Sequence, residues 1–233
     1  MSPSASNAQF DIGPMITASW EIFKNNLGPL LGGAVVVGGT VVIVALVIPV
    51  ILILIGGNTL LFSLLAAGLA KICQIGVFIL AGPLLAGLYK LCLDGVRGHP
   101  LDFGDVFWGF KNFLNTFLAY LVITIFTMVG MIFCIIPGFL VAILYLPTYL
   151  FIIDQGLDFW DAMEASRKMV MNNFGQWLLL GVVGMVMNLA GVLACGIGSF
   201  VTMSLVLLVV ALAYEQEREA VPLTTASPAS PAI

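Results

Sequence analysis

The chain has 233 residues, of which 61% are hydrophobic and only 9% are charged, with a formal net charge of -4. Soluble domains carry roughly 25% charged residues, so these few charges could not cover the surface of a soluble protein of this size. The composition therefore predicts that a lipid bilayer is the solvent of the protein. It shows no basic patch of the kind that binds nucleic acid.

One stretch of sequence occurs twice without gaps and once more in a weaker form. Residues 158–175 (DFWDAMEASRKMVMNNFG) match residues 11–28 (DIGPMITASWEIFKNNLG), with Asp, Ala, Ser, Asn, Asn and Gly at equivalent positions. The weaker copy, DFGDVFWGFKNFLNTF, covers residues 102–117. Each copy precedes an apolar run and is itself too short and too polar to cross a bilayer. The repeat therefore predicts three amphipathic helices that lie in the membrane interface.

The first unit covers residues 11–93. Asp11 is expected to cap its interfacial helix. The predicted buried face of that helix consists of Met15, Ile16, Ser19, Ile22 and Phe23. Apolar runs follow over 27–55 and 59–93, separated by a turn signal at Gly56-Gly57-Asn58. About 20 residues cross a bilayer, so both runs either tilt or protrude on the far side as a helical hairpin.

The second unit covers residues 102–154 and is expected to begin with an interfacial helix capped by Asp102. The predicted buried face of that helix consists of Val106, Phe107, Phe110, Phe113 and Leu114. Two spans follow, over about 114–136 and then to about Ile153, with a predicted turn at Pro137-Gly138.

The third unit covers residues 158–214 and begins with an interfacial helix that Asp158 is expected to cap. Its predicted buried face consists of Ala162, Met163, Ser166, Met169 and Val170. Spans over about 176–194 and 199–214 are joined by a predicted turn at 195–198.

These units predict an all-α fold, a polytopic membrane helix bundle with six transmembrane helices. The helices form three pseudo-repeated hairpins, each preceded by an amphipathic interfacial helix. Residues 1–10 are predicted to be a flexible N-terminus and residues 215–233 a disordered cytoplasmic tail. Six spans place the loop Lys and Arg residues on one side, which predicts a bacterial cytoplasmic membrane protein with both termini in the cytoplasm. Trp20, Trp108 and Trp160 lie one on each interfacial helix and predict an aromatic belt on that side.

Two charged residues near the spans are candidates for function. Lys71 lies well inside an apolar run, and an intramembrane ionisable group is a functional hypothesis by default. Its position about 20 residues before Leu91 favours a side chain that reaches the far interface. Asp154 ends the fourth span and could bind a cation or cap a helix. We favour a solvated boundary residue or an ion-pair partner for Arg167 or Lys168.

Ser19 and Ser166 occupy equivalent positions on the apolar faces of the first and third interfacial helices. They could contact a polar ligand, but close packing against a neighbouring span is favoured, since small residues let helices approach. The asparagine pairs at 25–26 and 172–173 are expected to bond unpaired backbone groups where each interfacial helix meets its span.

The four cysteines show no CxxC metal spacing. Cys134 and Cys195 lie in corresponding far-side turns, where an oxidising compartment could join them, but packing of free thiols is favoured. His99 is the sole histidine and lies in a polar loop. No HExxH, GxSxG or P-loop pattern occurs, so no catalytic, metal or cofactor site is predicted.

The segments DVFWGFKNF, CIIPGF and WDAMEASRKMVMNN resemble a broad group of uncharacterised bacterial multi-pass membrane proteins. The group includes the membrane-embedded region found with some glycerophosphodiester phosphodiesterases. The resemblance covers most of residues 10–215 and implies a membrane helix bundle. Those phosphodiesterases carry a separate catalytic domain that these residues lack, so the resemblance implies neither that activity nor any functional residues.

The leading hypothesis is a non-enzymatic membrane protein that binds membrane lipids or a membrane-protein partner, or a further copy of itself, as an accessory or scaffold. The alternative is a transporter or channel for a small or amphiphilic solute, with Pro83 and Pro147 providing broken helices. The near absence of ionisable groups in the spans argues against transport. An interfacial lipid enzyme ranks third, because it requires acidic residues that converge in one pocket.

Overall fold

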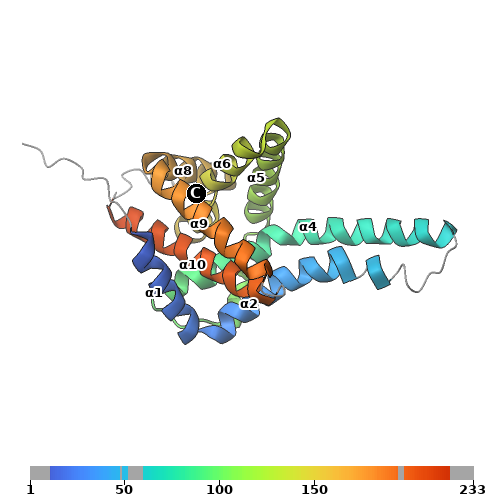
Figure 1. The fold of residues 1–233 in the computed structure, drawn as a ribbon, viewed down its shortest axis with the longest axis horizontal. Coiled ribbons are helices and arrows are strands. Elements are labelled where there is room, and N and C mark those ends of the chain that lie inside the picture. The colour runs from blue at the N-terminus through green and yellow to red at the C-terminus, as the bar shows by residue number, and fades with distance from the viewer. Residues whose placement is uncertain (1–10, 48, 52–59, 194–196, 221–233) are drawn as a thin grey trace, which may run out of the picture.

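The computed structural model describes residues 11–47, 49–51, 60–193 and 197–220, and these residues contain helices and no strand (Figure 1). In chain order the elements are α1 (Ile12–Asn25), α2 (Leu27–Val42), the π-helix η1 (Ile43–Val47), α4 (Leu60–Val96), the 3-10 helix η2 (Phe103–Phe110), α5 (Phe113–Phe133), α6 (Ile135–Leu144), α7 (Thr148–Gln155), α8 (Phe159–Asn172), α9 (Phe174–Leu193) and α10 (Ile197–Ala220). The predicted all-α class is confirmed.

Five segments are long and apolar enough to cross a membrane. They are Ala67–Val96, Phe113–Phe133, Ile135–Gln155, Phe174–Leu193 and Gly198–Glu219. Helices α1 and α2 together pass the same test but are bent by 97° at the break between them, which makes a sixth segment if the pair is one span. The arrangement agrees with a helical membrane bundle.

Helix α7 lies in the core of the molecule. Its residues Thr148 to Ile152 are all buried, which is the pattern of a helix surrounded by protein rather than one with an exposed stripe. Helices α4, α5 and α8 all contact α7. From the C-terminal helix α10, Tyr214 meets Phe151 edge to face, with ring centroids 5.1 Å apart. The core therefore joins elements from every part of the described chain.

Helix α4 and η2 are packed backbone against backbone. A Cβ atom at Gly87 would lie 1.7 Å from the carbonyl oxygen of Val106, and one at Gly109 would lie 2.1 Å from the carbonyl oxygen of Pro83. Only glycine, which has no Cβ, allows an approach this close. Helix α4 continues through Pro83, so this proline does not end the helix.

The segment after Asp102 is a 3-10 helix and not the predicted α-helix. Asp102 does cap it, because its Oδ1 accepts a hydrogen bond from the Gly104 N–H at 3.1 Å. A 3-10 helix has three residues per turn, so the buried residues are Val106 and Gly109, three positions apart. The face predicted with α-helical spacing was wrong beyond Val106. Its other members, Phe107, Phe110, Phe113 and Leu114, are exposed.

The turn between α5 and α6 falls at Cys134, not at the predicted Pro137-Gly138. Cys134 has an extended backbone, with φ -173° and ψ 154°, and α6 begins at the next residue. Pro137 therefore lies in the first turn of α6, where its missing N–H leaves no helical bond unmade. Gly138 packs across the turn, since a Cβ atom at Gly130 would lie 2.8 Å from its Cα.

Helix α2 with η1, and the first half of α4, form a long hairpin arm that extends beyond the rest of the molecule (Figure 1). Helix α4 has 37 residues, about 55 Å at 1.5 Å per residue, whereas the hydrocarbon core of a bilayer is about 30 Å thick. Exposed apolar residues cover this half of α4, including Leu64, Leu65, Leu69, Ile72 and Ile75. Of the two interpretations of the surplus length, a protruding hairpin fits this shape. The turn predicted at 56–58 lies outside the described residues.

Three asparagines with nearly the same backbone conformation connect short helices to the long helices that follow. The φ and ψ angles are -127° and 36° at Asn26, -120° and 44° at Asn112, and -126° and 45° at Asn173. At the first of these joints, the side-chain amide of Asn26 donates to the carbonyl of Ile22 at 3.1 Å, but that carbonyl also accepts from the Asn26 backbone N–H, so it is not the unpaired group that was predicted.

Helix α10 ends at Ala220, so residues 215–220 are helical and are not the start of a disordered tail. The polarity of this segment suggested disorder, but the carboxylates of Glu215 and Glu217 have partners. Glu217 is buried and accepts hydrogen bonds from Asn173 Nδ2 at 2.8 Å and Trp177 Nε1 at 3.1 Å. Residues 1–10, 194–196 and 221–233 lie outside the described part of the chain.

Candidate functional site

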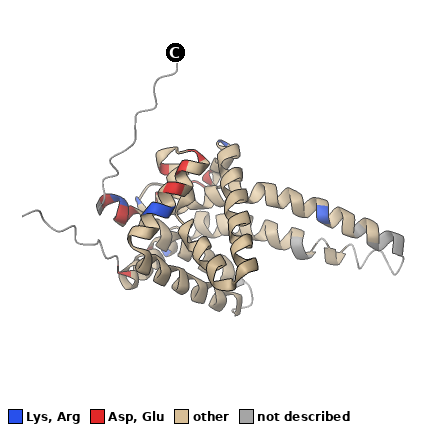
Figure 2. Ribbon diagram, turned by 90° about the horizontal axis from the view of Figure 1, so that it is seen from above, with Lys and Arg blue, Asp and Glu red and all other residues tan. Residues whose placement is uncertain are grey.

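A network of charged side chains joins the loop after α4 to the ends of α7 and α10. Asp154 is its centre: Oδ1 lies 2.7 Å from Nη2 of Arg97, and Oδ2 lies 3.0 Å from Nη1 of Arg218. The Tyr214 hydroxyl donates to Oδ2 at 2.9 Å. Glu215 pairs with both arginines. In Figure 2 most of the charged positions lie on the body of the molecule, away from the arm.

The partners predicted for Asp154 were wrong. Lys168 pairs with Glu164 within its own helix α8, at 2.9 Å. The Asp154 side chain is 8% exposed, and both of its oxygens are occupied by arginine or tyrosine. A bound cation would be repelled by the two guanidinium groups that contact this carboxylate, so the cation-binding interpretation does not fit. Within the described ranges, no group of three or more His, Cys, Asp or Glu side chains is placed to hold a metal ion.

The network is formally neutral. Partial burial acts to lower the pKa of Arg97, but its hydrogen bonds to Asp154 and Glu215, and the charges of both, raise that pKa above its usual value. Arg97 therefore stays charged, and the two arginines balance the two carboxylates. This arrangement is an ion-pair clamp between three chain segments rather than an acid–base site.

The side chain of Ser166 makes a hydrogen bond to a backbone carbonyl group at the break between α6 and α7. In a continuous helix the Leu144 carbonyl would accept from the Thr148 N–H, but that N–H donates to Tyr145 instead, at 3.2 Å. The Ser166 hydroxyl of α8 donates to the Leu144 carbonyl at 2.7 Å and so satisfies it. Ser166 was predicted to pack closely against a neighbouring span, and the structure adds a hydrogen bond from its hydroxyl to α6.

The hydroxyl of Tyr89 satisfies a second backbone carbonyl group at the break, that of Leu146. The Leu146 carbonyl loses its helical donor, because the Leu150 N–H donates to Pro147 at 3.0 Å. The Tyr89 hydroxyl of α4 donates to Leu146 at 3.0 Å. Sequence reasoning did not identify Tyr89, because its partner lies 57 positions away.

The other candidates are not brought together with Asp154. Ser19 is buried on α1, and its hydroxyl has no hydrogen-bond partner among the described residues. Lys71 is exposed on the arm, with Nζ 3.4 Å from Oε1 of Gln74. Cys134 is exposed at the α5–α6 turn, whereas Cys195 lies outside the described residues, so their disulfide stays a prediction.

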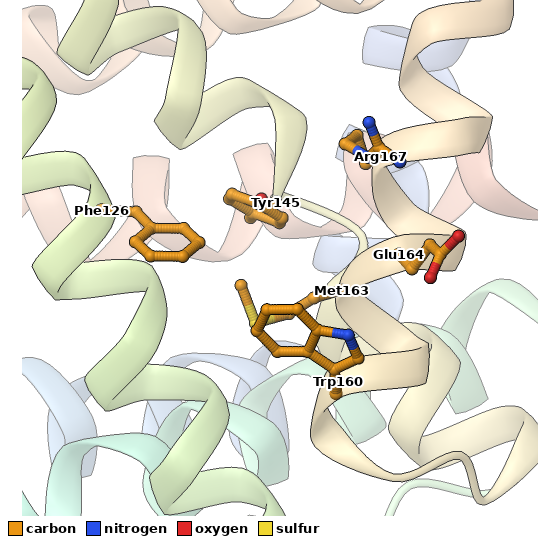
Figure 3. Close-up of a pocket in the computed structure, with 6 residues that line it drawn as sticks. All are labelled: Phe126, Tyr145, Trp160, Met163, Glu164 and Arg167. Atoms are coloured by element: carbon orange, nitrogen blue, oxygen red, sulfur yellow. The ribbon is translucent and has the colours of Figure 1, made fainter.

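A hollow of about 290 Å³ opens between α5 and α8, beside the break (Figure 3). Its lining residues are Phe126, Tyr145, Trp160, Met163, Glu164 and Arg167. Phe126 comes from α5, Tyr145 from the break, and the other four from α8. The rings of Phe126 and Tyr145 are tilted by 47°, with centroids 6.2 Å apart. In the close-up these two rings and that of Trp160 surround a shared space.

The polar groups of the hollow are mostly unpaired donors. Arg167 makes no ion pair, and neither Trp160 nor Tyr145 makes a side-chain hydrogen bond, with any residue in the described ranges. Oε1 of Glu164 accepts a hydrogen bond from Lys168 at 2.9 Å, and this bond, with the charges of Lys168 and Arg167, lowers the pKa of the carboxyl group. Sequence reasoning noted Trp160 as part of an aromatic belt but had no signal that the break would place Tyr145 beside it.

The comparisons with known proteins assign no activity to this geometry. No family model and no solved structure matches the chain. The chain is similar to an uncharacterized protein of Mycobacterium bovis and to uncharacterized proteins of two Mycobacterium tuberculosis strains, each 27% identical over 137 residues. The matched region is 58% of this chain and 42% of each relative, so the chain spans less than half of their length. The resemblance to the membrane region of glycerophosphodiester phosphodiesterases stays a prediction.

Proposed function

We propose that the protein is a non-enzymatic, multi-pass protein of the bacterial cytoplasmic membrane that binds membrane lipid in an accessory or scaffolding role. Both termini are in the cytoplasm. The three units over about 11–93, 102–154 and 158–214 are pseudo-repeats, each with an interfacial segment before its spans. The shared backbone conformation of Asn26, Asn112 and Asn173 supports this relationship.

The observation that carries the proposal is the distribution of paired and unpaired charge. The charges that lie inward neutralise one another around Asp154. The exposed cations without an ion pair to another described residue, apart from Lys71 on the arm, are Lys24, Lys111 and Arg167. Each belongs to, or directly follows, one of α1, η2 and α8, and each of these segments carries one tryptophan. Tryptophan beside an unpaired cation suits the headgroup region of a lipid bilayer.

The alternative is a transporter or channel for a small or amphiphilic solute, and the interruption of helical hydrogen bonding between α6 and α7 is the observation that favours it. In transporters of this kind, unwound backbone binds the solute. Here Ser166 and Tyr89 already occupy the carbonyls of Leu144 and Leu146. The break therefore offers less backbone to a solute than a transport site requires, and lipid binding ranks first.

Mass spectrometry of the full chain, purified in mild detergent, tests the proposal. A phospholipid retained at fixed stoichiometry is the expected result. A stoichiometric protein partner without lipid would contradict lipid binding and indicate a protein-binding accessory. Solute flux in proteoliposomes above that of empty vesicles would contradict the ranking and support transport.

A further inference from the structure

The hollow between α5 and α8 has the two-part chemistry of an amphiphile site. Its floor is formed by aromatic rings and the buried thioether of Met163. Its rim carries Arg167, whose guanidinium is exposed and has no ion pair among the described residues. Trp160 is 56% exposed, which is high for a side chain of this size and leaves its ring open to a ligand.

The side chains of the hollow that have no partner among the described residues determine which kind of lipid headgroup fits. Arg167, Trp160 and Tyr145 all offer N–H or O–H donors, whereas the carboxylate of Glu164 is bonded to Lys168. A phosphate diester carries a negative charge and acceptor oxygens, and guanidinium groups bind it well. Aromatic rings also bind quaternary ammonium groups, but here the two positive charges of Arg167 and Lys168 outnumber the single carboxylate of Glu164 and would repel such a cation.

The surroundings of the hollow suit lipid chains. A volume of about 290 Å³ is at the low end for ligand pockets, so it holds a headgroup and glycerol rather than a whole lipid. Helix α5 exposes an apolar stripe with helical spacing next to Phe126. The stripe consists of Ile125, Met128, Val129 and Ile132. Acyl chains that leave the hollow would lie along this stripe.

We propose that the hollow binds one phospholipid with a net negative headgroup, with the phosphate on Arg167 and the glycerol region against Trp160 and Phe126. This inference rests on the proposed lipid-binding function and names the site and the lipid class for it. Tyr145 reaches the hollow only because the helix breaks after Leu144, so the break forms part of the site.

The test compares wild type, Arg167→Gln and Lys71→Gln by native mass spectrometry of the full chain. Each delipidated protein in detergent is titrated with dioleoyl phosphatidylglycerol or dioleoyl phosphatidylcholine. Wild type should bind one phosphatidylglycerol in preference to phosphatidylcholine. Arg167→Gln should weaken that binding about tenfold, the scale of one charge-assisted hydrogen bond. Lys71→Gln removes an exposed cation of the arm that lies outside the hollow, and it should bind like wild type.

Each contrary result has a separate meaning. Wild-type binding that Arg167→Gln leaves unchanged would overturn the site but not the lipid-binding function. Equal binding of the two lipids would overturn the anionic headgroup. Binding of neither lipid by wild type would overturn the function and the site together. Because Arg167 is exposed, the variant should fold, and an unchanged melting temperature verifies this.

A fluorescence measurement locates the lipid independently. Phosphatidylglycerol with brominated chains should quench wild-type tryptophan emission more than that of Trp160→Phe, which keeps an aromatic ring in the hollow. Equal fractional quenching in the two proteins would contradict a lipid bound beside Trp160.

Discussion

Arg97 and Asp154 lie 57 positions apart in the sequence, yet the guanidinium Nη2 of Arg97 is 2.7 Å from the carboxylate Oδ1 of Asp154. This contact ties the loop that follows α4 to the last turn of α7. Through Arg218 and Tyr214 the same carboxylate also holds α10. One side chain therefore connects three segments that are remote in sequence.

Asp154→Ala should lower the free energy of unfolding by about 3 kcal/mol, because two guanidinium groups and a hydroxyl lose their shared acceptor. Thermal unfolding of the full chain in mild detergent measures the change. The matched control is Lys168→Gln, which breaks the exposed pair with Glu164 and should leave the melting temperature unchanged. If both variants melt like wild type, the network does not hold the three segments together.

Gly87→Ala should destabilise the protein by about 3 kcal/mol or more, since the new Cβ would lie 1.7 Å from the Val106 carbonyl oxygen and η2 would have to move. Gly76→Ala lies in the same helix, and a Cβ there would meet nothing within 4 Å. That control should be as stable as wild type. The comparison is made by folded yield in detergent and by melting temperature. Equal behaviour of the two variants would show that α4 and η2 are not in backbone contact.

The features that could be predicted best from the sequence are those that follow from apolar residues at α-helical spacing. In α8 the predicted face is buried at every position, because apolar residues at α-helical spacing determine which side packs. In η2 the same rule failed after Val106, because the segment is a 3-10 helix, which packs against α4 through Gly87 and Gly109. That contact depends on tertiary packing, and no local pattern reports it.

The candidate site was less predictable than the helices, for a related reason. The sequence identified Asp154 as a boundary carboxylate. Its partners Arg97 and Arg218 could not be predicted, because they lie beside Asp154 only once the fold has placed the loop after α4 and the end of α10 next to α7. The hollow requires Tyr145 and Trp160 to meet across a helix break. Pro147 marks that break in the sequence, but nothing there shows which side chains the break brings together.

Glu217→Leu should lower the free energy of unfolding by about 2 to 3 kcal/mol, because it removes the carboxylate that accepts from Asn173 and Trp177 in a buried setting. Glu217→Gln keeps one acceptor oxygen and should lose clearly less. Chemical unfolding followed by tryptophan fluorescence compares the two. A Gln variant as unstable as the Leu variant would mean that the negative charge, rather than the accepted hydrogen bonds, stabilises the α8–α9 joint.

The proposed orientation places the α5–α6 turn outside the cytoplasm, and Cys134 offers a native probe of it. Cys134 is exposed, whereas Cys92 is fully buried and acts as an internal control in a variant that carries Cys73→Ser and Cys195→Ser. A membrane-impermeant maleimide added to spheroplasts should label Cys134 and not Cys92. A cysteine introduced by Lys168→Cys, at an exposed position of α8, should react only after permeabilisation. The opposite pattern would place the cations of α8 outside the cell and overturn the positive-inside assignment, because a helical hairpin cannot present its turn and its charged base on the same side of the bilayer.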